Sequence, residues 1–320
     1  MKHSYLALII FGLLGGLFTA TAQQDPQYTQ YMYNTQVVNP AYVGNRDAFS
    51  IGGLYRTQWV GFEGAPDTAT LTLDTPIGAL DNMGLGLSIV QDQIGPATES
   101  NITIDYSYTI TTGEQSELSF GLKAGVDLLD VDFNKLNIDD SGDVFDQGNI
   151  DNKVQPQIGA GLYYNTNKFY VGLSVPNFLT SKHFDESSID DLNNGTAFEG
   201  DFSPAERLHY FLIAGYVFDL SENLKFKPAT LVKAVSGSPL QWDVSANFLL
   251  YDKLTLGAAY RWSAAMSAMV GFQATEGIFI GLGYDYQTTD IETYSDGSYE
   301  IMLRFDIFQK PERVLTPRFF

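Results

Sequence analysis

The chain lacks cysteine altogether, and it has only three histidines and 18 lysine and arginine residues against 38 acidic ones. The absence of cysteine excludes a disulfide-stapled scaffold and a thiolate metal site. The formal net charge of -20 argues against nucleic-acid binding and against a polybasic lipid anchor. Residues 23–320 also lack a long apolar run, because glycine, polar or charged residues interrupt every stretch. If this part of the chain enters a membrane, it must do so as a β-barrel.

The N-terminus has the features of a secretory signal. Met1-Lys2-His3 precede an apolar run from Leu6 to Ala20, and Ala20-Thr21-Ala22 forms a small-x-small cleavage site. The run falls short of the roughly 20 residues that a spanning helix needs, which disfavours the alternative of a membrane anchor. We expect residues 1–22 to be a signal peptide and the mature protein to begin at Gln23.

Alternation of apolar and polar residues is what the sequence has in abundance. Between Leu118 and Leu128 one face is apolar, and the other carries Ser119, Lys123 and Asp127 with two glycines. About fourteen such stretches fill residues 47–308, and at about 10 to 13 residues they are long enough to cross a bilayer. A soluble β-sandwich also alternates, so alternation alone leaves that alternative open.

The links between these stretches are alternately short and roomy. The even-numbered links are Gly78 to Asn82, Thr112-Gly113-Glu114, Asn165-Thr166-Asn167, Ser221-Glu222-Asn223, Tyr251-Asp252-Lys253 and Thr275-Glu276-Gly277. The odd-numbered links include Asp132 to Asn152, Leu179 to Ala205, Thr288 to Ser298 and the shorter Gln91 to Thr98. We therefore predict an all-β fold, a transmembrane antiparallel β-barrel of about 14 strands with long extracellular loops and short periplasmic turns. Both termini are expected in the periplasm.

The first third of the chain carries an ordered set of motifs. They are Gln24-Asp25-Pro26-Gln27-Tyr28-Thr29-Gln30-Tyr31-Met32-Tyr33-Asn34, Asn39-Pro40-Ala41-Tyr42-Val43-Gly44, Tyr55-Arg56-Thr57-Gln58-Trp59, Gly84-Leu85-Gly86-Leu87 and Asp92-Gln93-Ile94-Gly95. This set resembles the PorP/SprF family of outer-membrane proteins, which is linked to type IX secretion and gliding motility in Bacteroidota.

The resemblance implies a non-enzymatic barrel in the cell outer membrane that helps to export or anchor a large cell-surface protein, such as a gliding adhesin. The partner would then be the C-terminal domain of that adhesin, in addition to outer-membrane lipid. For some relatives the resemblance also implies ties to periplasmic peptidoglycan-associated proteins or to proteins linked to the type IX motor. The alternative is an outer-membrane transporter or channel for small or hydrophobic solutes, because a barrel fold does not fix function.

Residues 23–46 are too polar to cross lipid, and they contain too many aromatic residues for an unstructured linker. We expect them to plug the lumen, since a barrel of fourteen strands leaves space that its own side chains do not fill. A periplasmic docking strip and an unstructured leader are the alternatives. The candidates for lining the lumen or binding a partner are Asp25, Pro26, Gln27, Tyr28, Gln30, Tyr31, Tyr33, Asn39, Pro40, Tyr42, Arg56 and Trp59.

Arg56 and Trp59 are placed on the first strand at positions of opposite parity, so they are expected on different faces. We interpret Arg56 as a lumen charge beside an acidic neighbour and Trp59 as an interfacial anchor.

An irregular strand is expected at Pro228, because proline cannot donate a ladder hydrogen bond. We predict a bulge or a locally unpaired strand there. The tail, residues 309–320, carries Lys310, Arg313 and Arg318 as candidates for docking to a periplasmic protein.

Few residues could carry catalysis or bind a metal. After the signal only His183 and His209 remain, without serine-histidine-acid spacing, so we expect neither an enzyme nor a cofactor. The stretch from Asn137 partly matches a calcium-binding loop, but its twelfth position is Gly148 instead of glutamate. We interpret it as a solvated acidic loop and predict no metal site.

Overall fold

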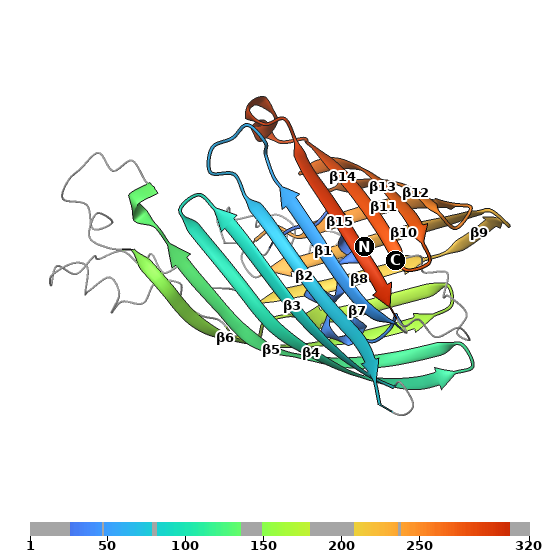
Figure 1. The fold of residues 1–320 in the computed structure, drawn as a ribbon. Helices are drawn as coiled ribbons and strands as arrows, with labels where there is room; N and C mark the ends of the chain where they lie inside the picture. The colour runs from blue at the N-terminus through green and yellow to red at the C-terminus, as the bar shows by residue number, and fades with distance from the viewer. Residues whose placement is uncertain are drawn as a thin grey trace, which may run out of the picture.

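The computed structural model describes residues 26–46, 48–78, 82–135, 149–179, 208–235 and 238–307. In these ranges one antiparallel sheet closes on itself, because β1 (Phe49–Thr57) pairs with the last strand, β15 (Ser298–Ile307) (Figure 1). The strands between them are β2 (Asp67–Ile77), β3 (Met83–Ile94), β4 (Ala97–Gly113), β5 (Ser116–Val131), β6 (Ile150–Thr166), β7 (Phe169–Val175), β8 (His209–Tyr216), β9 (Phe218–Ser221), β10 (Leu224–Val235), β11 (Gln241–Leu250), β12 (Leu254–Arg261), β13 (Ala265–Thr275) and β14 (Ile278–Gln287). β8 and β9 are two parts of one barrel strand, since both pair with β10, so the 15 segments make a barrel of 14 strands.

The helical elements of the described residues are short. They are η1 (Tyr31–Tyr33), α2 (Thr35–Val38), η2 (Pro40–Tyr42), η3 (Phe133–Lys135) and η5 (Asp290–Tyr294). None of these helices is long and apolar enough to cross a membrane.

The polar faces of the strands point inward. In β5 the inward Ser119 and Lys123 are 0% and 4% exposed, whereas the outward Leu122 is 63% exposed. The same alternation repeats around the ring, as in β14, where Ile280 and Leu282 face outward and Asp285 is fully buried. This burial is the reverse of that in a water-soluble protein, which covers its apolar side chains. It fits a barrel whose outer wall contacts lipid and whose interior is polar.

Antiparallel connectivity sorts the links into two rims. The long-loop rim contains the links that follow β1, β3, β5, β7, β10, β12 and β14; the turn rim contains those that follow β2, β4, β6, β9, β11 and β13. Five of the predicted short turns lie at the turn rim, and the sixth, Gly78 to Asn82, includes residues 79–81, which lie outside the described ranges. Tyr251 and Asp252, in the three-residue link Tyr251-Asp252-Lys253 between β11 and β12, both have positive φ, 54° and 52°, a backbone conformation typical of tight hairpin turns. The described chain from β1 to β15 begins and ends at this rim.

The wall of the barrel is uneven in height, whereas the sequence predicts strands of similar length. β4 and β6 have 17 residues each and β5 has 16, whereas β7 has only seven. The pairing of β6 with β7 ends where Ala160 faces Val175, but β6 itself continues to Ile150 on the long-loop side. A small apolar cluster of Leu129, Val131 and Phe133 packs at the top of this tall wall. These strands exceed the ~9 to 11 residues needed to cross a bilayer because they continue to pair beyond it.

Two expected boundaries are wrong in detail. Trp59 does not lie on the first strand, because β1 ends at Thr57 and Trp59 occupies a turn with φ of 46°. The link expected from Gln91 to Thr98 is much tighter, since β3 and β4 are joined through Gly95, at φ of 56°, and Pro96. In both places the sequence pattern marked the turn residues but not how far pairing extends.

The irregularity predicted at Pro228 is confirmed. β10 pairs with β9 through residues 224–226 and with β8 from Ala229 onward, so the ladder to this neighbour is interrupted at residues 227–228. Val217, between β8 and β9, donates its backbone N–H to the carbonyl of Lys168 instead, at 2.8 Å. On the other side Pro228 stays in register with Ala246 of β11.

Candidate functional site

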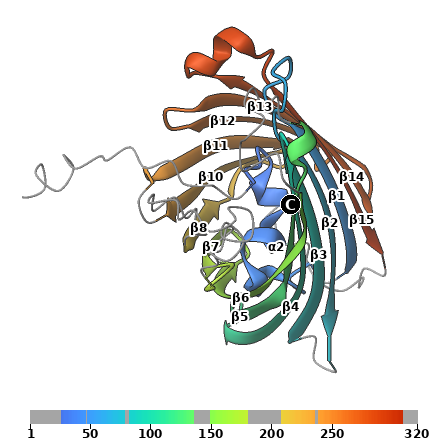
Figure 2. The same ribbon diagram turned by 90° about the vertical axis from the view of Figure 1, so that its left-hand side faces the viewer.

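Residues 26–46, which we call the lumen segment, lie inside the barrel, and Figure 2 shows α2 within the ring of strands. Gln27 donates to Gln241, the first residue of β11 at the long-loop rim, at 2.9 Å. At the other end Arg46 lies 2.9 Å from Asp306, next to the end of β15 at the turn rim. The lumen segment therefore runs along the barrel axis from one rim to the other.

The two ends of the described chain lie at different rims, and the termini themselves, which are expected in the periplasm, lie outside the described residues. The first described residue, Pro26, lies beside Gln27 at the long-loop end, whereas the last described residue, Ile307, lies at the turn rim. The reason is that the chain must descend the whole lumen before Phe49 can start β1 at the turn rim.

A buried charge cluster holds the outer end of the lumen segment. Arg56 is 1% exposed, and its guanidinium nitrogens lie 2.6 Å from Asp285 and 3.4 Å from Glu300. Glu300 accepts the backbone N–H groups of Thr29 and Gln30, at 2.9 and 2.8 Å. Thr29 Oγ1 donates to Asp285 Oδ1 at 2.7 Å. This Arg56 cluster ties the segment to β1, β14 and β15, the strands on either side of the closing seam, through charge-assisted hydrogen bonds.

The inner half of the lumen segment is bonded to β2, β3 and β5. Gln36 Nε2 lies 3.1 Å from the carbonyl oxygen of Leu73 and 3.2 Å from that of Leu87. Lys123 forms an ion pair with Asp105 at 3.3 Å and donates to the carbonyl of Val37 at 3.1 Å. These contacts satisfy backbone and side-chain groups that would otherwise be costly to bury.

Asn39 shows why the segment turns where it does. Its side-chain oxygen accepts the N–H of Ala41 at 3.0 Å and so caps η2, whose first residue is Pro40. Its side-chain nitrogen donates to the carbonyl of Leu162 in β6 at 3.0 Å. The Asn39-Pro40 motif therefore both starts a helical turn and fixes it to the wall.

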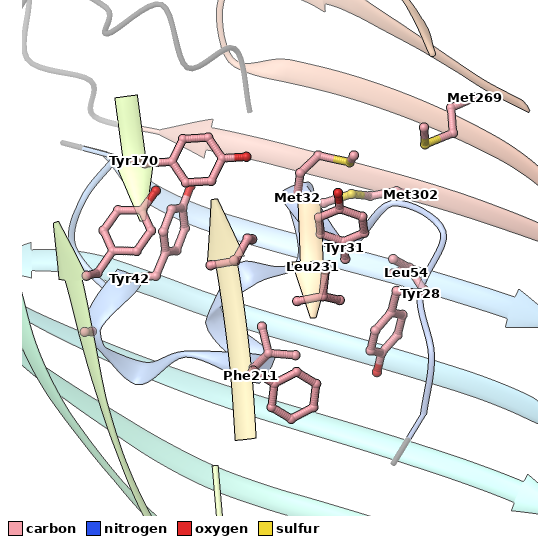
Figure 3. Close-up of a cluster of buried hydrophobic side chains, with 14 residues drawn as sticks. Tyr28, Tyr31, Met32, Tyr42, Leu54, Tyr170, Phe211, Leu231, Met269 and Met302 are labelled. Atoms are coloured by element: carbon pink, nitrogen blue, oxygen red, sulfur yellow. The ribbon is translucent and has the colours of Figure 1, made fainter. Parts of the chain in front are cut away.

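Five tyrosines belong to the cluster of 14 buried hydrophobic side chains inside the lumen (Figure 3). Tyr28 and Tyr31 are buried, with their hydroxyls 3.0 Å from Thr70 and 3.2 Å from Ser245. Tyr42 meets Tyr163 edge to face with ring centroids 5.5 Å apart. A tyrosine suits this place because its ring fills apolar volume while its hydroxyl finds a polar partner.

Inward glycines of the wall make room for the lumen segment. A Cβ at Gly121 of β5 would overlap the backbone nitrogen of Ala41, and one at Gly84 of β3 would overlap the carbonyl of Val43. Gly161 of β6 and Gly281 of β14 face Asn39 and Gln30 in the same way. The wall therefore lacks side chains where the segment passes, so the backbone of the segment packs directly against the strands.

The structure brings most of the predicted site residues together in the lumen. The buried ones are Tyr28, Gln30, Tyr31, Asn39, Pro40, Tyr42 and Arg56, and the half-buried ones are Pro26, Gln27, Tyr33 and Trp59. Trp59 sits apart, at the long-loop rim, where its backbone N–H donates to the hydroxyl of Ser298. Residues outside the described ranges include Asp25, Lys310, Arg313, Arg318, His183, the signal sequence and the stretch from Asn137 to Gly148.

Other residues of the site were not singled out from the sequence. Asp285, Glu300, Gln36 and the inward glycines hold the segment, but they look like ordinary members of polar strand faces. Alternation along the strand could have placed the glycines, because Gly121 lies on the same polar, inward face of β5 as Ser119 and Lys123. In the described ranges no group of three His, Cys, Asp or Glu residues lies close enough to hold a metal ion.

Comparison with known proteins fits this barrel. The family model described as "Type IX secretion system membrane protein PorP/SprF" matches residues 20–305. The chain belongs to the PorP/SprF family. Its place in the cell is therefore the outer membrane, in association with type IX secretion components. The PorP/SprF motifs around Tyr28, Asn39 and Arg56 are the same residues that build the lumen segment and the Arg56 cluster.

Solved structures share only the general form with this PorP/SprF protein. The outer membrane protein Omp33 of Acinetobacter baumannii is 9% identical at a TM-score of 0.47, covering 82% of this chain and 100% of that one. A FadL homologue of Pseudomonas aeruginosa is 13% identical at a TM-score of 0.46, covering 91% and 95%. No curated protein matches the chain at significant similarity.

Proposed function

We propose that this protein is a non-enzymatic partner barrel of the type IX secretion system that exports or anchors a large cell-surface protein, such as a gliding adhesin. Family membership supports the link to secretion. The observation that carries the proposal is the filled lumen, in which wall glycines accommodate residues 26–46 and buried ion pairs hold them. A barrel filled in this way suits a scaffold that binds a partner at a rim.

The long-loop rim is the side on which we place the exported partner. Outer-membrane barrels carry their longer loops outside the cell and their short turns in the periplasm. The tall wall of β4 to β6 rises on this side and extends the surface available to a partner. The turn rim, where β15 ends, then faces the periplasmic components, to which Lys310, Arg313 and Arg318 would dock.

Co-purification from the native outer membrane tests the proposal. A tagged wild-type barrel is expected to retain one large surface protein in stoichiometric amount through mild detergent extraction. Glu114→Ala, at an exposed carboxylate in the turn between β4 and β5, serves as the control and should leave both secretion and retention unchanged. A preparation that holds only a lipid or a small solute would support the alternative, a transporter for small or hydrophobic solutes, and would reject the scaffold.

A further inference from the structure

The outward face of the barrel is hollowed beside the closing seam. A groove of about 390 Å³ crosses β13, β14, β15 and β1, which are neighbours in the sheet. Its lining includes Val270, Leu282 and Ile301, which are exposed and adjacent in the register of β13, β14 and β15. Small-molecule sites have volumes of about 300 to 1,000 Å³, so the groove has room for a ligand.

Tyrosines border the groove on its long-loop side. Tyr284 and Tyr299 face each other in the next outward row toward that rim, with ring centroids 5.1 Å apart. Ala268, which is paired with Tyr284, is small and leaves the groove open at this level. Tyr299 is 48% exposed, and its hydroxyl has no hydrogen-bond partner among the described residues. A hydroxyl donor therefore lies next to the aliphatic lining.

The position of the groove indicates the kind of molecule that occupies it. The outward wall lies in the outer membrane, so the medium that fills a hollow there is lipid. An acyl chain matches the aliphatic lining, and the ester carbonyl at the head of that chain can accept a hydrogen bond from a tyrosine hydroxyl. Tyrosine suits a membrane interface because its ring is apolar and its hydroxyl is polar.

The rim above the groove is acidic. Its two links, residues 58–66 and 288–297, contain no lysine or arginine. Their exposed carboxylates are those of Glu63, Asp290, Glu292 and Asp296. Asp67 adds a carboxylate that accepts a hydrogen bond from Tyr55, another groove residue, at 3.2 Å. Negative charge attracts cations and repels anionic headgroups, so charge complementarity favours a lipid whose headgroup carries an amine.

We propose that the groove binds an acyl chain of an amine-bearing phospholipid, with Tyr299 donating to the ester carbonyl and with the amine facing the acidic rim. The site goes beyond the proposed function, because it holds a lipid whichever protein the barrel exports. The bound lipid covers the outer side of β1, β14 and β15, the strands that carry the Arg56 cluster on their inner side.

Native mass spectrometry of the detergent-purified protein measures this binding. The wild-type barrel is loaded separately with phosphatidylethanolamine and with the anionic phosphatidylglycerol of the same acyl chains. We expect about fivefold more retained phosphatidylethanolamine than phosphatidylglycerol. Ala268→Phe fills the groove and is expected to lower the retained phosphatidylethanolamine about fivefold. The matched control Ala124→Phe, on the exposed outward face of β5, should change it by less than about twofold.

A second variant tests the acidic rim and leaves the wall of the groove intact. Retention of phosphatidylethanolamine should fall to that of phosphatidylglycerol when four substitutions are combined, Glu63→Gln, Asp290→Asn, Glu292→Gln and Asp296→Asn. Equal retention of the two lipids by the wild type overturns the amine assignment, as does phosphatidylglycerol that binds equally well once Mg²⁺ is added. Equal losses in Ala268→Phe and Ala124→Phe indicate a general lipid shell and overturn the site. A wild-type dimer that Ala268→Phe dissociates places a second copy of the chain in the groove and also overturns it.

Discussion

Removing the carboxylate of Glu300 should release the lumen segment from the closing seam of the barrel. Glu300→Ala leaves the backbone N–H groups of Thr29 and Gln30 without their acceptor. Each unsatisfied buried donor costs about 1 to 3 kcal/mol. Arg56 keeps Asp285 as its partner but loses the second carboxylate, 3.4 Å away. We therefore expect a loss of about 3 to 6 kcal/mol, in line with the ~3 to 5 kcal/mol typical of broken buried ion pairs.

Two variants make this measurement specific. Glu300→Gln keeps one carbonyl oxygen in place, so roughly half of the loss is expected, about 1.5 to 3 kcal/mol. Glu114→Ala removes an exposed carboxylate from the turn between β4 and β5, where a change within about 0.5 kcal/mol is expected. The free energy of unfolding is measured by denaturant titration of the refolded barrel in lipid vesicles, and protease sensitivity near residues 26–46 reports release of the segment.

The result that would refute this reasoning is equally clear. A Glu300→Ala barrel as stable as Glu114→Ala, with a protease-resistant lumen segment, would show that the Arg56 cluster does not hold the segment. A loss equal in Glu300→Ala and Glu300→Gln would show that the charge matters and that the geometry of the hydrogen bonds does not.

The remaining predictions concern the fit of the lumen segment and the lipid face. Gly121→Ala is expected to cost about 2 to 4 kcal/mol by the same titration, because its Cβ overlaps the backbone of Ala41. Gly53→Ala meets no atom within 4 Å and should change stability by less than about 1 kcal/mol; equal effects would contradict the packing described. Leu122→Arg, on the outward wall, should cost about 2 to 4 kcal/mol in a bilayer, and a neutral outcome there would argue against lipid contact.

The barrel itself was predictable from sequence because its determinants are local. Alternation of two residues fixed the faces of β5, and hairpin residues such as Tyr251 and Asp252 fixed the turns. The antiparallel connectivity then required alternate links to share a rim. What failed were quantities that depend on distant pairing, such as the 17-residue length of β6, which is set by its contacts with β5.

The lumen site was predictable only in outline. The tyrosines and Arg56 stand out in the sequence, but their partners Thr70, Asp285 and Glu300 lie in other strands and bear no local mark. The direction of the lumen segment could not be read from periodicity at all, since it depends on which rim Gln27 reaches. The inward glycines, by contrast, are visible in the sequence as gaps in the polar strand faces, and they mark where the lumen segment passes.

Conductance of the purified wild-type barrel in planar lipid bilayers tests the central claim most directly. A lumen held shut by residues 26–46 predicts a bare-membrane baseline, with current steps appearing only in variants that free the segment, such as Glu300→Ala. Steady open-channel steps from the wild-type protein would contradict a filled lumen and would favour a pore for solutes over a scaffold for an exported protein.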